Sequence, residues 1–383
     1  MQRGEPHLLI DATAVPADRG GVGRYVDSLL AALDQDGARV SVVCQPRDAG
    51  LYARIAPNSR VVPAAEAVAT RTARLTWEQT TLPRLVRRLG ADVLHSPHYT
   101  TPLANPAASV VTLHDATFFT GAALHSPVKA RFFRTWTKTA LRRATLCVVP
   151  SEATATGLAR SAGADRRAMH VMHHGVDPEF FHPPSPAEIR AVRDRFSLRD
   201  QPYVAFLGAL EPRKNVPALI RGFTLAARGR ADDPALVLAG QPGWDVRVER
   251  ALEAVPHRIR VIRAGYVPFA ELPGFLGGAH VLAYPSIGEG FGLPVLEAMA
   301  CGAAVLTTRR LSLPEVGGDA VAYCGIRAAD VAAGLTELLD DPARRSALST
   351  AAQRRAKDFT WASCATQHRE AYARAHHLHR RRS

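Results

Sequence analysis

The sequence contains little cysteine and no long apolar run. Its five cysteines are far apart and form no Cys-x-x-Cys pair, which argues against a disulfide scaffold or a structural zinc site and favours a reducing compartment. No stretch approaches the roughly 18 uncharged apolar residues that a membrane-spanning helix requires. The first residues lead directly into a strand-like segment, without the apolar region of a signal peptide. We therefore expect a cytoplasmic protein that meets a membrane, if at all, from its cytoplasmic side.

Acidic residues are scarce relative to basic ones. Asp and Glu total 35 against 48 Lys and Arg, a net charge of +13, which favours an anionic partner such as nucleic acid, a membrane surface or a phosphorylated small molecule. Hydrophobic residues make up 47% and charged residues 22%, values that exclude a disordered, collagen-like or coiled-coil chain. At about 100 to 200 residues per domain, the length predicts two or three domains.

Short β-branched runs alternate with helical segments along the whole chain, which is typical of βαβ units and parallel sheets. In the first half we expect strands at 8–11, 40–44, 92–96, 110–114, 146–150 and 170–173 and helices near 22–33, 77–89, 128–143 and 152–162. In the second half we expect strands at 203–208, 235–240, 259–264, 280–284 and 304–307.

A proline-rich segment at 175–186 has no periodicity and indicates a linker between two such sheets. We therefore predict one domain at 1–175 and a second at 176–360. An amphipathic helix from 361 and a basic tail that ends at 383 follow them.

Ligands bind beyond the carboxyl ends of parallel strands, so the loops there are candidate sites. In the loop at 18–25, Gly20, Gly21 and Gly23 precede a helix, whose N-terminus attracts anions. The full G-x-G-x-x-G spacing of an NAD site is missing. The glycines alone leave a plain turn and a phosphate contact equally open.

Two further loops carry charged or titratable side chains. Arg213 and Lys214 follow the first strand of the second half, at the expected start of a helix, where both can reach one phosphate group unless they are simply solvated surface cations. His114 and Asp115 end a strand of the first half. His114 is either a structural or a functional histidine, and Asp115 either orients it or caps the next turn.

The segment at 285–302 carries the strongest pattern. A glycine-rich turn with Glu289 leads into a helix that has Pro294 in its first turn and Glu297 further along. Two carboxylates so placed can accept hydrogen bonds from hydroxyls at two points of one elongated ligand, while the N–H groups of Phe291 to Leu293 face its anionic part. The alternative is one helix-capping and one solvated glutamate. The 15 histidines are scattered, so we predict no metal site.

Together these segments resemble a known family. GEGFGLPVLEAMACG, in which seven residues separate Glu289 from Glu297, resembles the E-x7-E motif of the retaining glycosyltransferases of family 4. LGALEPRKN resembles the diphosphate-binding loop of that family. The resemblance continues in GGVGRY, VTLHDATFF, VVPSEATATGL, HGVDPEFFHP and LPEVGGDA, so it spans nearly the whole chain.

The resemblance implies an α/β protein of the GT-B fold, in which two Rossmann-like parallel-sheet domains face one another across a cleft. It implies that Arg213 and Lys214 hold the diphosphate of a nucleotide-sugar donor and that Glu297 holds its ribose hydroxyls. Glu289 would hold hydroxyls of the transferred sugar. The backbone residues implied beside it are Gly290, Phe291, Gly292 and Leu293.

Further roles follow from the same resemblance. Gly21 would approach the diphosphate from the first domain, and His114 would reach the sugar and help to stabilise the transition state. The segment around Gly265 and Tyr266 would contact the base, and the helix near 361–372 would cross back to the first domain. Fixed cations stabilise the leaving diphosphate, so no cofactor or metal ion is expected, and no covalent nucleophile is assigned.

The resemblance favours a mannosyltransferase of cell-surface polysaccharide assembly, with GDP-mannose as the first donor candidate, a UDP-sugar such as UDP-glucose as the second, and a glycan or lipid-linked acceptor. The segment at 126–144 contains six cations, three aromatics and no acid. It is either an ordinary helix with a solvated basic face or a contact to anionic lipid. The alternative functions are a nucleic-acid-binding protein, for which no reading motif is present, and an NAD-dependent oxidoreductase or epimerase.

Overall fold

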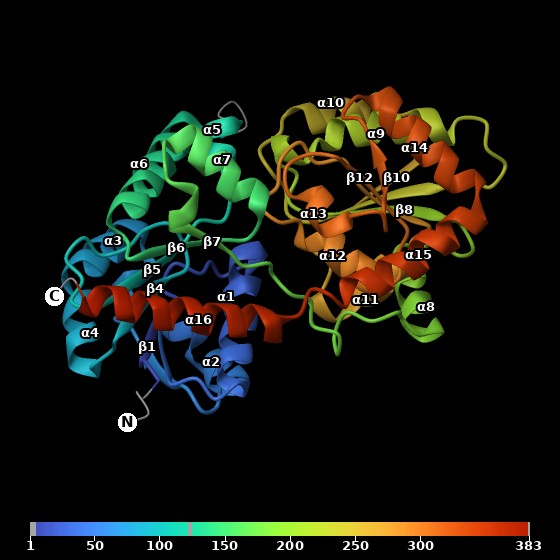
Figure 1. The fold of residues 1–383 in the computed structure, drawn as a ribbon. Helices are drawn as coiled ribbons and strands as arrows, with labels where there is room; N and C mark the ends of the chain where they lie inside the picture. Colours follow the sequence, from blue (N-terminus) through green and yellow to red (C-terminus); the bar gives the residue numbers. More distant parts are fainter. Residues whose placement is uncertain (1–4, 122–124, 382–383) are drawn as a thin grey trace. The chain divides into compact units, whose positions relative to one another are not determined.

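The computed structural model describes residues 5–121 and 125–381. The chain divides into two compact units. Unit 1 comprises Met1–Gly175 together with Thr360–Ser383, and unit 2 comprises Val176–Phe359. Each unit is built around one parallel sheet flanked by helices (Figure 1).

The sheet of unit 1 has seven strands in the order β3-β2-β1-β4-β5-β6-β7, and all of its strand pairs are parallel. Its strands are β1 (Leu8–Asp11), β2 (Val40–Cys44), β3 (Arg60–Pro63), β4 (Val93–Ser96), β5 (Ala108–Thr112), β6 (Leu146–Val149) and β7 (Met169–Val171). Leu8 and Ile10 pack in one apolar cluster and Leu9 in another. Because neighbouring residues of a strand point to opposite faces, helices must cover both faces of this sheet.

The helices of unit 1 include two that the sequence prediction lacked, at Ala49–Ile55 and Thr117–Thr120, and they differ from it at 77–89. They are α1 (Gly20–Gln35), α2 (Ala49–Ile55), α3 (Arg71–Thr80), α4 (Leu82–Leu89), α5 (Thr117–Thr120), α6 (Pro127–Arg143), α7 (Glu152–Ala162) and α16 (Trp361–Arg380). The single helix expected at 77–89 is wrong, since α3 and α4 are separate helices. Pro83 lies at the start of α4, where its missing N–H cannot continue the preceding helix.

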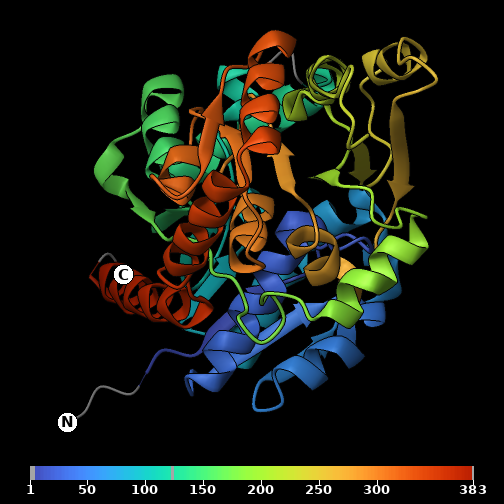
Figure 2. The ribbon, with the colours of Figure 1, turned by 90° about the vertical axis from the view of Figure 1, so that its right-hand side faces the viewer.

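Helix α16 belongs to unit 1 although the rest of that unit ends at residue 175. In Figures 1 and 2 it is the red helix that lies beside the blue helix α1. Cys364, Ala365, Ala371 and Tyr372 are buried in the same apolar cluster as β1. A basic tail after the helix was expected, but the helix continues to Arg380; residues 382–383 lie outside the described part of the chain.

The sheet of unit 2 has six parallel strands in the order β10-β9-β8-β11-β12-β13. They are β8 (Tyr203–Leu207), β9 (Ala235–Ala239), β10 (Arg260–Gly265), β11 (Val281–Tyr284), β12 (Val305–Thr308) and β13 (Ala322–Cys324). The helices are α8 (Pro186–Arg195), α9 (Val216–Ala227), α10 (Arg247–Glu253), α11 (Leu272–Gly277), α12 (Leu293–Ala300), α13 (Leu313–Gly317), α14 (Ala328–Asp340) and α15 (Pro342–Ala356).

The strand order of unit 2 reverses between β8 and β11, which pair directly. The chain runs from β8 outward through β9 to β10 and then returns to the other side of β8. The loops after β8 and β11 therefore leave the same edge of the sheet side by side, and such a switch point is where open α/β sheets bind ligands. Among the described residues, no helix has the length and apolar character of a membrane span.

Candidate functional site

The loop after β8 carries two of the predicted site residues. Arg213 and Lys214 lie in a 3-10 turn, Pro212–Lys214, and not at the start of a helix as the sequence suggested; α9 begins only at Val216. Asn215, which lies between this turn and α9, has φ +59°. Its side-chain amide donates to the carbonyl oxygens of Pro285 and Ile326 at 3.2 and 2.9 Å.

The loop after β11 is fixed directly onto this turn. The Ile287 N–H donates to the Arg213 carbonyl oxygen at 2.8 Å, and the Ser286 Oγ lies 2.9 Å from the same oxygen. Residues some 75 positions apart thus form one rigid surface at the switch point, as the parallel topology requires.

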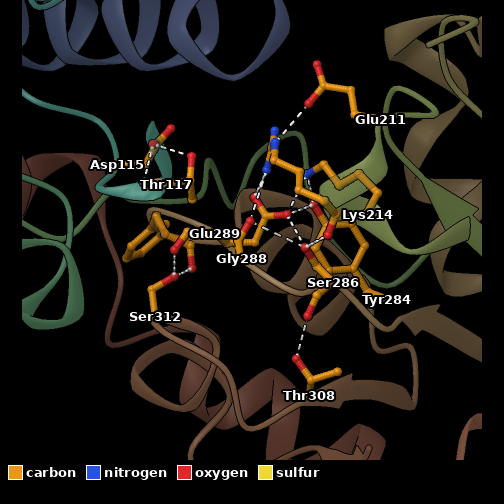
Figure 3. A network of polar contacts seen from close by, with 12 residues as sticks. Asp115, Thr117, Glu211, Lys214, Tyr284, Ser286, Gly288, Glu289, Thr308 and Ser312 are labelled. Atoms are coloured by element: carbon orange, nitrogen blue, oxygen red, sulfur yellow. Dashed lines mark hydrogen bonds and ion pairs between the residues drawn. The ribbon is translucent and has the colours of Figure 1, made fainter. Parts of the chain in front are cut away.

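Glu289 is the centre of this surface (Figure 3). Its carboxylate accepts hydrogen bonds at 2.7 Å from Lys214 Nζ, 2.6 Å from Arg213 Nη1, 2.6 Å from Ser286 Oγ and 3.1 Å from Tyr284 Oη. Lys214 Nζ also contacts the Tyr284 hydroxyl. Glu211 accepts from Arg213 Nε at 2.8 Å. The three predicted residues Arg213, Lys214 and Glu289 are therefore brought together in unit 2.

Glu289 and Lys214 are almost inaccessible to water, and this governs their ionisation. Glu289 is 7% exposed and Lys214 is 6% exposed. Burial alone would raise the pKa of Glu289, but the charges of Arg213 and Lys214, together with hydrogen bonds from Lys214 and Ser286, outweigh it and lower that pKa to about 2. Burial, assisted by the charge of Arg213, lowers the pKa of Lys214 to about 8 despite the nearby carboxylate.

Three residues of this cluster were not found from the sequence. Tyr284 was expected only to end a strand, yet its buried hydroxyl joins Lys214 to Glu289. Ser286 holds Glu289, and Ser312 Oγ lies 2.9 and 2.8 Å from the carbonyl oxygens of Glu289 and Phe291. The available signal was a tyrosine at the end of a wholly apolar strand, because a buried phenol needs a hydrogen-bond partner.

The segment after Glu289 forms the N-terminus of α12. Gly292, at φ +109°, precedes the helix, and Pro294 lies in its first turn as predicted. Glu297 lies on α12 and is 3% exposed. The backbone from Gly290 to Leu293 therefore approaches a helix N-terminus, where N–H groups can bind anionic or hydroxyl oxygens.

The predicted base-binding segment ends β10, the edge strand of the same sheet. Gly265 is the last residue of β10, and its carbonyl oxygen accepts from the Gly240 N–H at 2.7 Å. The Tyr266 side chain is 63% exposed, so its ring is available to a ligand at the carboxyl edge of the sheet.

Three of the predicted residues lie in unit 1. His114 follows β5, and its Nε2 lies 2.6 Å from the Pro97 carbonyl oxygen, so Nε2 carries the hydrogen and the neutral ring leaves Nδ1 as an acceptor. Burial lowers the pKa of His114. Asp115 accepts from the Thr117 N–H and hydroxyl, so it caps the turn. Gly21 lies in the first turn of α1, and a Cβ there would meet no heavy atom within 4 Å.

Among residues 5–121 and 125–381, no group of three or more His, Cys, Asp or Glu side chains is placed to hold a metal ion. What the described site offers to a ligand is two adjacent cations, a helix N-terminus and two buried carboxylates, all in unit 2.

Comparison with known proteins assigns both halves of the chain. Residues 188–355 match the family "Glycosyl transferases group 1", and residues 19–180 match "Glycosyltransferase Family 4". The O-antigen chain mannosyltransferase B of Escherichia coli is 33% identical over 284 residues, which cover 73% of this chain and 74% of that protein.

A second relative is similar over about half the length of each protein. The GDP-mannose-dependent alpha-(1-6)-phosphatidylinositol monomannoside mannosyltransferase of Mycolicibacterium smegmatis is 33% identical over 208 residues, or 52% of this chain and 54% of that protein. Among solved structures, Anabaena HepE in complex with UDP-glucose superposes with a TM-score of 0.75 at 16% identity, covering 96% of this chain and 99% of that one. The chain belongs to glycosyltransferase family 4 and has the GT-B fold.

Proposed function

We propose that this glycosyltransferase moves a hexose from a nucleotide sugar to a glycan or lipid-linked acceptor during cell-surface polysaccharide assembly, with retention of configuration. GDP-mannose is the favoured donor, because the two relatives described above are mannosyltransferases by name. UDP-glucose is the second candidate, since it is the ligand named for the superposed Anabaena structure.

One observation carries this proposal, namely the pair Arg213 and Lys214 at the switch point, in the same unit as the N-terminus of α12. Departure of a nucleoside diphosphate places negative charge on the leaving phosphate and positive charge on the sugar ring. Fixed cations and helix N–H groups stabilise the phosphate charge without reorganisation. The leaving phosphate would then guide attack from its own face of the sugar, so no enzyme nucleophile is needed.

Each of the other predicted residues is proposed to bind one part of the donor. Glu297 would accept hydrogen bonds from the ribose hydroxyls, and the Gly265–Tyr266 segment would contact the base. Glu289 and the neighbouring backbone would bind hydroxyls of the transferred sugar. In unit 1, Gly21 and His114 stay predictions; the neutral His114 ring has an acceptor nitrogen that suits a sugar hydroxyl.

Release of nucleoside diphosphate from GDP-mannose, UDP-glucose and other nucleotide sugars tests the proposal. Lys214→Ala and Glu289→Ala should each lower turnover by about tenfold to a thousandfold. Arg250→Ala removes an exposed arginine of α10 in the same unit and should leave turnover unchanged. We expect turnover to survive EDTA. Unchanged turnover in both site variants would contradict these roles.

The basic helix α6 supports a peripheral contact with anionic lipid, which would bring the enzyme to a lipid-linked acceptor. Val128 is 83% exposed, and Arg131, Lys138, Arg142 and Arg143 are exposed as well. Phe133 is buried and stacks on Phe118, so it serves the core. Sedimentation with phosphatidylglycerol vesicles should fall in Arg131→Glu/Lys138→Glu. Equal sedimentation of this variant would leave α6 an ordinary solvated helix.

A further inference from the structure

The carboxylate of Glu289 is bound by four protein donors in the structure as it stands. An ionised carboxylate offers about four acceptor positions. Lys214, Ser286 and Tyr284 crowd Oε1, and Arg213 binds Oε2, so Oε1 has no position left and Oε2 has one. All four distances lie between 2.6 and 3.1 Å. The side chain proposed to bind the sugar is thus engaged with the side chains proposed to bind the diphosphate.

The directions of these hydrogen bonds identify Tyr284 as part of the same arrangement. The Lys214 ammonium has no acceptor, so it donates to the Tyr284 oxygen and the Tyr284 hydrogen is left for Glu289. The Tyr284 side chain is fully buried. Lys214 is therefore held from two sides, by a phenol oxygen and by a carboxylate, in an environment where charge pairs interact strongly.

A donor diphosphate would place a second anion on the same two cations. Both anions cannot occupy the same N–H groups of Arg213 and Lys214, and buried like charges repel strongly. Resting on the proposed function, we propose that Glu289 occupies the place of the diphosphate at Arg213 and Lys214 until the donor binds, and that the diphosphate releases the Glu289 carboxylate to accept hydroxyls of the donor sugar.

This exchange makes the two parts of the donor depend on one another. The diphosphate has to break the contacts of Glu289, and only the attached sugar gives that carboxylate new hydrogen bonds. After transfer the nucleoside diphosphate no longer carries the sugar, so Glu289 returns to the cations and favours product release. The enzyme consequently binds the intact donor in preference to its product.

Glu289→Gln tests the exchange in the full-length protein. Calorimetric titration at pH 6.5, where the charged form of Lys214 is favoured, would use inorganic pyrophosphate, GDP and UDP as separate probes. Because the competing anion is gone, we expect pyrophosphate and the nucleoside diphosphate of the true donor to bind about tenfold more tightly. The preference for the nucleotide sugar over that nucleoside diphosphate should disappear, and turnover should fall. Unchanged or weaker pyrophosphate binding would overturn the proposal.

Glu297→Gln is the matched control. It removes the same charge from a buried glutamate of unit 2 that is assigned to the ribose. We expect weaker GDP or UDP binding and unchanged pyrophosphate binding. If pyrophosphate binds more tightly to this variant as well, general electrostatics explains the effect and the exchange is refuted.

A milder pair of variants covers the case in which Glu289→Gln does not fold. Tyr284→Phe keeps every charge but removes the hydroxyl that joins Lys214 to Glu289, so pyrophosphate should bind a few-fold more tightly. Tyr203→Phe removes another fully buried hydroxyl, on β8, which donates to the Phe275 carbonyl oxygen at 2.8 Å; its pyrophosphate affinity should equal that of the wild type. Equal affinities of the two variants would refute the exchange.

Binding and sugar-transfer measurements on the wild-type protein distinguish failure of this inference from failure of the proposed function. If it neither binds pyrophosphate, GDP or UDP nor transfers sugar, both proposals fail. If it transfers sugar while Glu289→Gln and Tyr284→Phe bind pyrophosphate no more tightly, the exchange alone fails.

Discussion

At the scale of single residues, Lys214 shows how burial changes the chemistry of a side chain. An exposed lysine stays charged well beyond neutral pH. Burial and the charge of Arg213 bring the pKa of Lys214 to about 8, so its charge becomes sensitive to mildly alkaline conditions. The cation assigned to the donor diphosphate is consequently one that titrates.

We expect kcat/KM for the donor to fall as pH rises through about 8, because Lys214 loses its proton and with it the attraction for phosphate. Beyond that point the loss should approach about tenfold per pH unit. The measurement is kcat/KM from about pH 6 to about pH 10 in wild type and in Lys214→Arg, whose guanidinium stays charged. A similar alkaline decline in both proteins would show that another group titrates.

The sequence predicted the charged residues of the site but not the groups that hold them. Arg213 and Lys214 follow Pro212, and Glu289 lies between two glycines, each in a loop after a strand, and this pattern can be read from the sequence. Tyr284 and Ser312 act through contacts with residues 70 and 23 positions away. Such contacts depend on which strands become neighbours, and strand order cannot be read from local composition.

At the scale of secondary-structure elements, α16 is fastened to unit 1 by a buried chain of hydrogen bonds. The donor and acceptor of every hydrogen bond in this series can be assigned. His368 Nδ1 must donate to the Cys364 carbonyl oxygen, so its Nε2 accepts from a phenol, and the other hydrogens follow. In order, the donors and acceptors are Tyr372 to His95, His95 to Thr112, Thr112 to Tyr25, Tyr25 to His368 and His368 to Cys364, at 2.8 to 3.0 Å.

These hydrogen bonds require both His95 and His368 to be neutral. Burial lowers the pKa of His368 to about 4, and burial together with nearby histidines lowers the pKa of His95 well below its usual value. In the unfolded chain both would titrate near 6.5. The unfolded state therefore binds more protons below that pH, and the free energy of unfolding falls as pH drops from about 7 towards about 4.

Replacement of His368 by Gln should weaken this acid dependence. Between about pH 7 and about pH 5, one histidine with such a shift accounts for about 2 kcal/mol of lost stability. Urea unfolding of wild type and His368→Gln at both pH values, followed by circular dichroism, measures the difference. His98, His114 and His174 in unit 1 also have lowered pKa values through burial, so part of the dependence should remain. An undiminished dependence in the variant would exclude His368 as a contributor.

A glycine fixes the loop after β9 against the loop that carries the cations. A Cβ at Gly243 would lie 2.0 Å from the Leu210 carbonyl oxygen, so Gly243→Ala must displace one of the two loops. We expect it to weaken binding of GDP or UDP, at a cost of about 1 to 3 kcal/mol. Gly50→Ala in α2 is the control, because a Cβ there meets no heavy atom within 4 Å. Equal nucleotide affinity in both variants would show that the loops tolerate the shift.

The elements themselves were predicted best where strands are wholly buried. Strands β1 and β2 have the predicted bounds, since Leu8–Asp11 and Val40–Cys44 are apolar runs between two layers of helices. The edge strand β3 was missed because Arg60 and Pro63 at its ends leave it half exposed. Strand β13, a short strand at Ala322–Cys324, was also missed.

At the scale of the whole molecule, the two units differ in how the chain builds them. Unit 2 is one continuous segment, whereas unit 1 needs both ends of the chain. The chain passes between the units twice, and the Val176 N–H donates to the Phe359 carbonyl oxygen at 3.0 Å. The Cβ of any larger residue at Gly175 would lie 2.2 Å from the Trp361 backbone nitrogen, so the two passages run in close contact.

Removal of α16 should therefore affect the two units unequally. A chain that ends at Phe359 retains all of unit 2, including the cluster around Glu289, but exposes the part of unit 1 that Ala365, Ala371 and Tyr372 cover. We expect this chain to bind GDP or UDP with wild-type affinity while one thermal transition moves to lower temperature and sugar transfer is lost. Calorimetric melting with and without nucleotide assigns the transitions, because a ligand stabilises only the unit that binds it. Loss of nucleotide binding on truncation would show that unit 2 depends on α16 for its own fold.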